Sequence, residues 1–236
     1  MSKRIKIIAG IIGVAAAIFG LLAYYQSQGI LKIFPSREDR RIEQILTIDR
    51  SKFGKPEGLP DEKFEEEIAK LADLKKQIEQ KPDDPTLWFA FAFTKDFLND
   101  HEGSVAAWEK SFELQPLDFR TPVNMANVYQ YFLKDYKKAE FYYREGLKLK
   151  ADYTIAYQGL ADLYRFNWKE KQNLFEPLME EAIQKDPANK ASYLVGLIEY
   201  FVRGGDLTRG QALFNELKTL DPKEASELKT DYPQLQ

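Results

Sequence analysis

The stretch ADYTIAYQGLADLYR, residues 151–165, decides the fold of this chain. Within it, large apolar side chains stand at Tyr157, Leu160 and Tyr164, and the small Ala161 follows Leu160 directly. Spacings of three and four residues place these side chains on one face of an α-helix. A small residue on that face lets a second helix approach closely, while the large ones fill the space between helices. The pattern therefore predicts a helix that packs against other helices.

Prolines that end helical patterns give the period at which this pattern recurs. Pro82 and Pro116 are 34 residues apart, and Pro187 and Pro222 are 35 apart. Ala151 stands between them where a further proline is expected. A helical hairpin that repeats about every 34 residues must stack on its neighbours to bury its apolar face. The period predicts an all-α solenoid of about four helical hairpins.

The residues inside each period agree with this interpretation, because each first helix carries large and small side chains at similar positions. The four sets are Trp88, Phe91, Ala92, Ser104, Trp108, Ser111 and Pro116; Met125, Ala126, Tyr129, Ala139, Tyr143 and Gly146; Tyr157, Leu160, Ala161, Tyr164, Ala182 and Pro187; and Tyr193, Gly196 or Leu197, Tyr200, Gly210, Phe214 and Pro222. The pattern resembles that of the tetratricopeptide repeat family. The resemblance covers roughly residues 85–222 and implies a right-handed solenoid.

The resemblance also divides the chain. We expect repeats at 85–118, 119–153, 154–189 and 190–222, a leading capping helix at 61–84, and a partial cap or tail at 223–236. Residues 26–60 are expected to form a stalk, with a short helix that starts at Ser36 and then a loop rich in glycine and proline.

Two prolines set expected helix starts within the repeats. Thr121 can cap a helix and Pro122 can take its first position, so the first helix of the second repeat should start late. Pro177 cannot lie deep in a helix, so the second helix of the third repeat should start near Glu176. The second to fourth repeats carry one or two extra residues, which we place at turns.

Residues 7–25 form an uncharged, largely apolar run after three basic residues. Nineteen residues make a helix of about 28 Å at about 1.5 Å per residue, close to the roughly 30 Å of a bilayer core. We expect a transmembrane helix at 7–25, with residues 1–6 in the cytoplasm and the array extracytoplasmic. The alternative is a cleaved signal peptide and a secreted array, because Ala15 to Ala17 resemble a cleavage site.

Small residues recur every four positions in this run, at Ala9, Gly13 and Ala17. Such a stripe can let membrane helices pack closely, so a homodimer through these three residues is one hypothesis. Alanine and glycine are also common in membrane helices, and the stripe then has no such role.

The residues that most site chemistry needs are scarce. The chain has no cysteine and one histidine, so a zinc site lacks ligands and thiol catalysis lacks a nucleophile. His101 follows Asp100 in an expected turn. Residues 61–236 hold 24 Lys and Arg against 32 Asp and Glu, a balance that disfavours nucleic acid. We expect no catalytic residue, metal, cofactor or nucleic-acid partner, although the sequence does not exclude a pair of carboxylates.

In tetratricopeptide proteins the first helices of successive repeats line a groove that receives a peptide or helix, and the resemblance implies the same here. The implied groove residues are Phe89, Phe93, Asn124, Asn127, Gln130, Gln158, Asp162 and Arg165, with Leu194, Ile198 and Phe201 from the fourth repeat. Amide groups can pair with a peptide backbone, and aromatic residues can hold apolar anchors. The alternative is that some of these residues pack between repeats and never meet a ligand.

We therefore expect a non-catalytic, membrane-tethered scaffold or adaptor that binds a partner protein, in the assembly of envelope proteins. A self-associating structural membrane protein is one alternative. Another is a cytochrome c assembly or periplasmic chaperone-like factor. The Pro-Asp-Asp-Pro junction at 82–85, with the helix before it and the repeats after it, resembles the repeat module of bacterial cytochrome c assembly factors.

Overall fold

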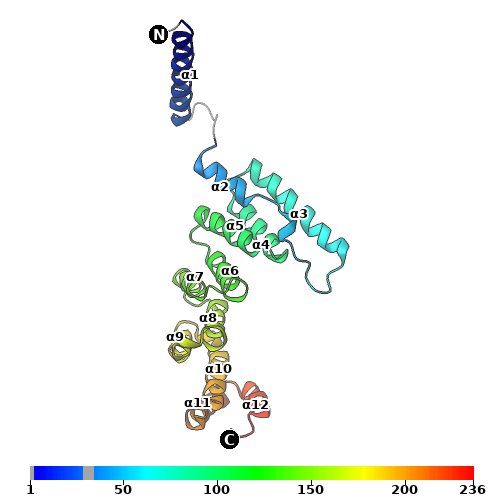
Figure 1. Cartoon of the computed structure of the whole chain (residues 1–236). Coiled ribbons are helices and arrows are strands. Elements are labelled where there is room, and N and C mark those ends of the chain that lie inside the picture. Colours follow the sequence, from blue (N-terminus) through cyan, green and yellow to red (C-terminus); the bar gives the residue numbers. More distant parts are fainter. Residues whose placement is uncertain (1–2, 29–34) are drawn as a thin grey trace. The chain divides into compact units, whose positions relative to one another are not determined.

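The computed structural model describes residues 3–28 and 35–236, except for the side chains of residues 3–11, 13, 14 and 26. These residues form twelve α-helices, with short 3-10 and π segments and no β-strand in the described part (Figure 1). The predicted all-α class is confirmed. The chain divides into two units, Met1–Thr47 and Ile48–Gln236, and each is described by itself.

The first unit holds α1 (Lys3–Ser27) and α2 (Arg37–Ile45). Ser36 starts α2 as predicted: its hydroxyl accepts the Asp39 backbone N–H at 2.9 Å, and the Asp39 carboxylate accepts the Ser36 N–H at 2.8 Å. Two first-turn donors are satisfied in this way. Among the described residues, no helix combines the length and the apolar character needed to cross a membrane. The side chains of Ala9 and Gly13 in the proposed dimer stripe lie outside the described part.

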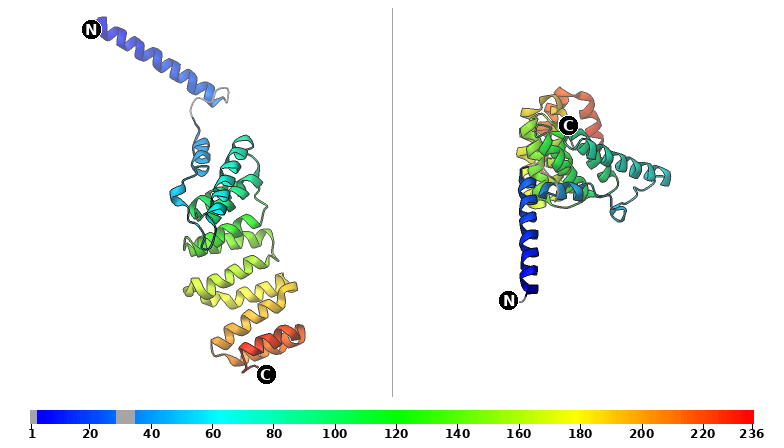
Figure 2. Two further views of the ribbon diagram at one scale, coloured as in Figure 1. Left: turned by 90° about the vertical axis from the view of Figure 1, so that its right-hand side faces the viewer. Right: turned by 90° about the horizontal axis from the view of Figure 1, so that it is seen from above.

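The second unit is an array of helical hairpins. Its helices are α3 (Asp61–Gln80), α4 (Pro85–Phe97), α5 (His101–Leu114), α6 (Arg120–Tyr131), α7 (Tyr136–Leu149), α8 (Thr154–Asp162), α9 (Phe175–Lys185), α10 (Lys190–Arg203), α11 (Leu207–Leu220) and α12 (Pro222–Asp231). Helices α4 to α11 pair as hairpins that stack in chain order, and α3 packs on α4 (Figure 2). The predicted helical repeat array is confirmed.

Aspartates fix where many of these helices begin. In each case the carboxylate accepts a hydrogen bond from a backbone N–H of the first turn, which has no partner inside the helix. The pairs are Asp84 with Thr86 (2.9 Å), Asp100 with Gly103 (3.1 Å), Asp135 with Lys138 (3.1 Å), Asp206 with Arg209 (3.0 Å) and Asp221 with Glu224 (3.0 Å). These caps set the starts of α4, α5, α7, α11 and α12.

One predicted helix start is wrong. Helix α6 begins at Arg120, before Pro122, because Asp118 accepts both the Arg120 backbone N–H at 3.0 Å and its guanidinium at 2.8 Å. Pro122 then lies in the first turn, where a missing N–H leaves no hydrogen bond unmade. The hydrogen bonds from the Arg120 side chain hold the pKa of Asp118 below its usual value.

Extra residues of the third hairpin lie inside a helix rather than only at turns. After α8 the chain continues as a π turn, Leu163–Asn167, in which the Trp168 N–H donates to the Leu163 carbonyl at 2.7 Å. A π turn accommodates one more residue than an α-helical turn. A 3-10 segment, Lys169–Leu174, then leads to α9, which begins one residue before the predicted start and holds Pro177 in its first turn.

Part of the expected stalk is fixed to the first hairpin. The Gly54 N–H donates to the Leu98 carbonyl at 2.8 Å, and the Asn99 side-chain amide donates to the Gly54 carbonyl at 2.9 Å. Asn99 has a φ of 65°, a left-handed conformation that asparagine tolerates better than most residues. Residues from Ile48 onward accordingly belong to the second unit.

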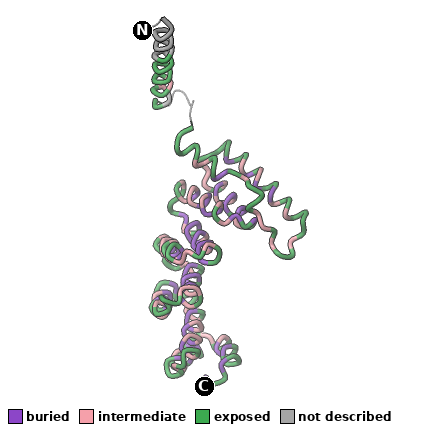
Figure 3. The backbone as a smooth tube through the Cα atoms, viewed as in Figure 1, coloured by how far each residue is buried: buried purple, intermediate pink, exposed green. Residues whose placement is uncertain are grey.

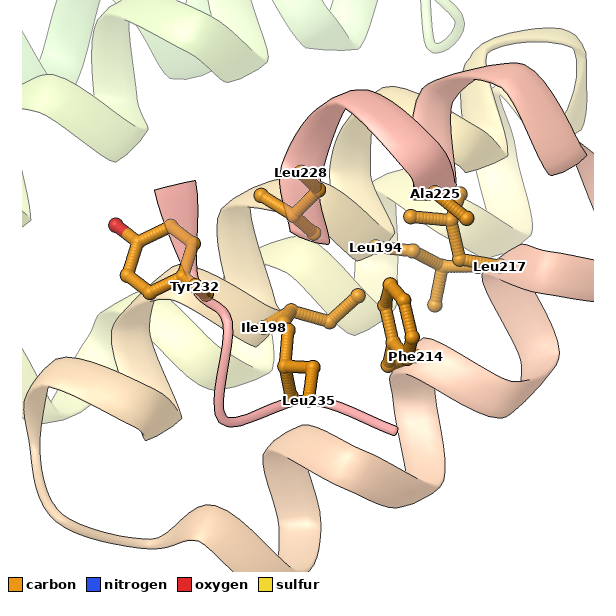
Figure 4. Close-up of a cluster of buried hydrophobic side chains, with 8 residues drawn as sticks. All are labelled: Leu194, Ile198, Phe214, Leu217, Ala225, Leu228, Tyr232 and Leu235. Atoms are coloured by element: carbon orange, nitrogen blue, oxygen red, sulfur yellow. The ribbon is translucent and has the colours of Figure 1, made fainter. Parts of the chain in front are cut away.

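Helix α12 closes the end of the array, where the sequence predicted only a partial cap. Buried residues follow the facing sides of the stacked helices (Figure 3). The last cluster joins Ala225, Leu228, Tyr232 and Leu235 to Leu194, Ile198, Phe214 and Leu217 (Figure 4). Leu194 and Ile198, which the resemblance placed in the groove, are 1% and 0% exposed. They are buried because both α11 and the C-terminal segment pack against them.

Candidate functional site

The predicted groove residues lie on the first helices of the hairpins, α4, α6 and α8. We call the surface formed by Phe89, Phe93, Asn124, Asn127, Gln158, Asp162 and Arg165 the first-helix surface. Arg165 stands in the π turn that continues α8. Phe93 and Gln158 are exposed, and the other members are half-buried. The hairpins thus leave these side chains partly accessible to a ligand.

The two phenylalanines on α4 differ in how firmly they are held. The Phe89 ring meets the Trp108 ring edge-on at 6.4 Å between centroids, and the Arg120 guanidinium lies 5.4 Å from the Phe89 centroid. Phe93 is 57% exposed, and Phe97, one turn further along α4, is 38% exposed. This end of the surface is therefore apolar and accessible.

The middle of the surface rests on a buried tyrosine. The Tyr143 hydroxyl, from α7, donates to the Asn127 side-chain oxygen at 2.6 Å and lies 2.7 Å from the Gln130 amide. Gln130 is 0% exposed and also lies 2.7 Å from the Asn167 side chain. Burial raises the pKa of Tyr143, so its hydroxyl stays a neutral donor. Of the predicted groove residues, Gln130 therefore packs between hairpins, as the alternative reading allowed.

Two polar contacts link neighbouring hairpins at this surface. The Tyr131 hydroxyl of α6 donates to the Asp162 carboxylate at 3.1 Å. Burial, and after it the charge of Asp162, raise the pKa of Tyr131 to about 12. The Arg165 guanidinium lies 3.5 Å from the Glu199 carboxylate of α10 and 5.0 Å from the centroid of the Phe175 ring. Asp162 and Arg165 are thus held in place before any ligand arrives.

Three predicted residues surround one cavity. Gln158, Asp162 and Arg165 line a space of about 120 Å³ between the third and fourth hairpins. Its other lining residues are Ala161, Phe175, Met179, Ser192, Tyr193 and Gly196. Ser192 and Gly196 are not among the predicted groove residues, because the sequence leaves the register of the fourth repeat ambiguous by one residue. The turn of the fourth hairpin matches that of the first, and it places the buried Leu197, not Gly196, at the position of Phe91.

The only histidine has a packing partner and an acidic neighbour. His101 is the first residue of α5, rather than part of a turn as expected. Its ring stacks on Phe132 at 3.7 Å between centroids, and its Nδ1 lies 2.8 Å from the Asp96 carboxylate. Across the described ranges, no three His, Cys, Asp or Glu side chains are grouped so that they could hold a metal ion.

The fold defines a class: an array of stacked α-helical hairpins that is similar to tetratricopeptide arrays. The sequence model of the tetratricopeptide repeat matches residues 123–153, within α6, α7 and the turn that follows. This match confirms the predicted resemblance over residues 123–153.

Solved structures share the same fold. A crystal structure of MamA is 13% identical, with a TM-score of 0.54, and the match covers 70% of this chain and 89% of that one. The MamA RS-1 ArsTM double mutant is 21% identical, with a TM-score of 0.52 and coverage of 69% and 84%. MamA 41-end from Desulfovibrio magneticus RS-1 is 21% identical, with a TM-score of 0.50 and coverage of 64% and 84%. No curated protein sequence matches the chain.

Proposed function

We propose that this chain is a protein-interaction module that holds a segment of a partner protein along the first-helix surface. The observation that carries the proposal is the exposure of Phe93 on α4 and Gln158 on α8, with half-buried amides on α6 between them and half-buried charged groups beside Gln158. An exposed aromatic ring can hold an apolar anchor of a partner, and amides can pair with its backbone. Asp162 and Arg165 add one charge of each sign, so we expect a partner segment without strong net charge.

Two exposed phenylalanines allow a matched test of this surface. Phe93 on α4 and Phe141 on α7 are 57% and 56% exposed. We expect p-benzoylphenylalanine placed at Phe93 in the full-length chain to crosslink a discrete partner in the native cell on irradiation. The same probe at Phe141, on a second helix, should not. The measurement is immunoblotting of the crosslinked product and its identification by mass spectrometry.

The double variant Phe93→Ala with Gln158→Ala should reduce capture of that partner at least about fivefold, the effect of losing about 1 kcal/mol from an interface. Phe141→Ala is the control and should leave capture unchanged. Crosslinking of the same product from both positions would show that the first helices are not the binding surface. Circular dichroism checks that each variant keeps its helical content.

We also propose that residues 7–25 attach the array to a membrane, with the array on the extracytoplasmic side. The support is the uncharged run of nineteen residues after three basic ones. On this placement the partner is an envelope protein during its assembly. The alternatives are a cytochrome c assembly factor and a self-associating structural protein. Crosslinks to cytochrome c assembly components would support the first alternative. Crosslinks to a second copy of the chain would support the second.

Membrane attachment has a direct test. The full-length chain should stay with the membrane pellet after alkaline carbonate extraction, while a chain that lacks residues 1–28 should be released. Protease added outside spheroplasts should digest the array, because the proposal places it outside the cytoplasm. Release of the full-length chain by carbonate would refute attachment, and a protected array would refute only the orientation. Cleavage after Ala17 would appear as a shorter mature chain in intact-mass spectrometry.

A further inference from the structure

A larger cavity of the array gathers most of its arginines. Residues 61–236 contain five arginines, at Arg120, Arg144, Arg165, Arg203 and Arg209. The last three line one space of about 410 Å³, beside the turns of the third and fourth hairpins. Its other lining residues are Phe166, Gln172, Tyr200, Phe201, Gly204 and Asp206. Guanidinium groups are thus concentrated in one place, although acidic residues outnumber basic ones in this part of the chain.

The long connection of the third hairpin builds one wall of this cavity. Residues 163–174 connect α8 to α9, whereas the other three hairpins turn in fewer residues. Arg165 and Phe166 lie in the π turn of this connection, and Gln172 lies in its 3-10 segment. The opposite wall comes from the end of α10, the turn after it and the start of α11. The extra residues of the third hairpin therefore face the fourth hairpin across a space rather than filling it.

Carboxylates hold two of the three guanidinium groups in place. The Arg165 guanidinium lies 3.5 Å from the Glu199 carboxylate. Arg209 donates to the Asp206 carboxylate through its Nε at 2.7 Å, and to Glu176 through a terminal nitrogen at 2.8 Å. Among the described residues that line the cavity, Asp206 is the only acidic one. These contacts orient both arginine side chains before a ligand arrives, which lowers the entropic cost of binding.

The third guanidinium group, that of Arg203, has a neutral partner. Its Nε donates to the Tyr232 hydroxyl at 2.7 Å. The acidic charges that act on Arg203 are those of Glu199 and Asp231, and in the described part of the chain no carboxylate lies within ion-pair distance of it. An arginine carries N–H donors on both terminal nitrogens as well as on Nε. The terminal nitrogens of Arg203 accordingly remain as donors for a ligand.

This balance of charge favours a ligand with a single negative charge. Two of the guanidinium groups are already paired with carboxylates, and only Arg203 has no such partner. A doubly charged phosphate group would face the Asp206 carboxylate with more charge than Arg203 can balance. A carboxylate matches the planar fork of a guanidinium group with two parallel hydrogen bonds. The Phe166 and Tyr200 rings on the wall can pack against the methylene groups of an acidic side chain.

We propose that this cavity, which we call the arginine pocket, binds the carboxylate of an aspartate or glutamate side chain of the partner segment. Arg165 also belongs to the first-helix surface, so a segment along that surface passes the entrance of the pocket. A side chain can enter from a backbone that continues past Arg165, whereas a chain end would have to stop there. One acidic residue agrees with the weak net charge expected of the partner segment. This inference rests on the proposed function and names a residue type that its partner segment contains.

Arginine side-chain resonances can report on the pocket directly. In the full-length chain labelled with ¹⁵N, N-acetyl-glutamate methylamide should shift the Nε–Hε resonances of Arg203 and Arg209 in a saturable way. Arg120 is also exposed, but it donates to Asp118 on the second hairpin and should not respond. N-acetyl-glutamine methylamide has nearly the same shape without the charge and should leave all three resonances unchanged. N-acetyl-alanine, which carries only a terminal carboxylate, and inorganic phosphate should each bind at least about threefold more weakly.

Substitutions then separate the pocket from general effects of charge. Arg203→Gln should weaken the binding observed at Arg209 at least about tenfold, because it removes a charged hydrogen-bond donor of the ligand. Arg203→Lys keeps the charge without the planar fork and should weaken binding by a smaller factor. Lys137→Gln removes one exposed positive charge from the second hairpin and should change binding by less than about twofold. Circular dichroism checks the fold, and if Arg203→Gln does not fold, Arg203→Lys decides the question.

A saturable shift with the glutamate derivative that Arg203→Gln weakens supports the arginine pocket. The pocket is refuted by the absence of such a shift, by an equal response to the glutamine derivative, or by binding of N-acetyl-alanine or phosphate that is no weaker. The proposed function fails separately, because crosslinking from Phe93 tests the first-helix surface without involving Arg203. A crosslink from Phe93 without a response of Arg203 would refute the pocket alone.

Discussion

Replacing Lys95 by methionine should lower the free energy of unfolding by about 3–5 kcal/mol. The Lys95 Nζ lies 2.7 Å from the Asp100 carboxylate, and both side chains are only 3% exposed. Methionine keeps most of the volume and removes the positive charge, so Asp100 stays buried without its partner. Asp100 also caps α5 through the Gly103 N–H, so its carboxylate cannot turn to solvent without releasing the helix start. Urea unfolding followed by circular dichroism measures the loss.

Two controls show whether burial causes that loss. Lys63→Met removes one partner of the Lys63–Glu66 pair, whose side chains are 60% and 54% exposed, and should change stability by less than about 1 kcal/mol. Lys95→Met combined with Asp100→Asn should recover most of the loss, because asparagine still caps α5 and carries no charge. Equal effects of the two lysine changes would contradict the argument, as would a double variant no more stable than Lys95→Met.

The repeat array was predictable because its signal is local and recurs. Trp88 and Tyr157 lie in the first turn of equivalent helices. Both are almost fully buried, as the spacing of apolar residues predicted. Pro82 and Pro116 mark the same place in successive hairpins. Each of these features depends on residues close in sequence, so four weak matches at one period were enough to predict hairpins that stack.

The candidate site was less predictable, because exposure depends on contacts between distant residues. No residue close to Leu194 in sequence indicates that Leu228 and Leu235 pack in the same cluster. Gln130 shares a helix face with the surface residues, yet it is buried between Tyr143 and Asn167 at the π turn. A one-residue change of register turns a side chain by about 100° around a helix, which moves it from surface to interior. For this reason the fourth repeat could not be assigned from sequence.

Tyr143→Ala should lower the free energy of unfolding by about 3–5 kcal/mol, as expected for loss of a large buried aromatic side chain. The Tyr143 ring is 0% exposed, and its hydroxyl satisfies the side-chain groups of Asn127 and the buried Gln130. Tyr143→Phe removes only the hydroxyl and should cost about 1–3 kcal/mol, because the Gln130 amide stays buried without that partner. The ratio of the two losses, measured by urea unfolding, separates packing from hydrogen bonding.

The expected effect of Gly159→Ala on the free energy of unfolding changes sign when the Tyr143 ring is removed. In the natural chain, Gly159→Ala places a methyl group against the Tyr143 ring and should lower the free energy of unfolding by about 1–3 kcal/mol. In the Tyr143→Ala background that ring is gone, so the same change should stabilise by up to about 1 kcal/mol through helix propensity. Gly196→Ala, on α10 against α9, should stabilise equally in both backgrounds. If Gly159→Ala changes the free energy of unfolding in the same direction in both backgrounds, contact with the Tyr143 ring is not the reason for a glycine at this position. The predicted reversal would mean that Tyr143 requires Gly159 on α8 while its hydroxyl positions Asn127, so the packing that joins two hairpins also orients the surface between them.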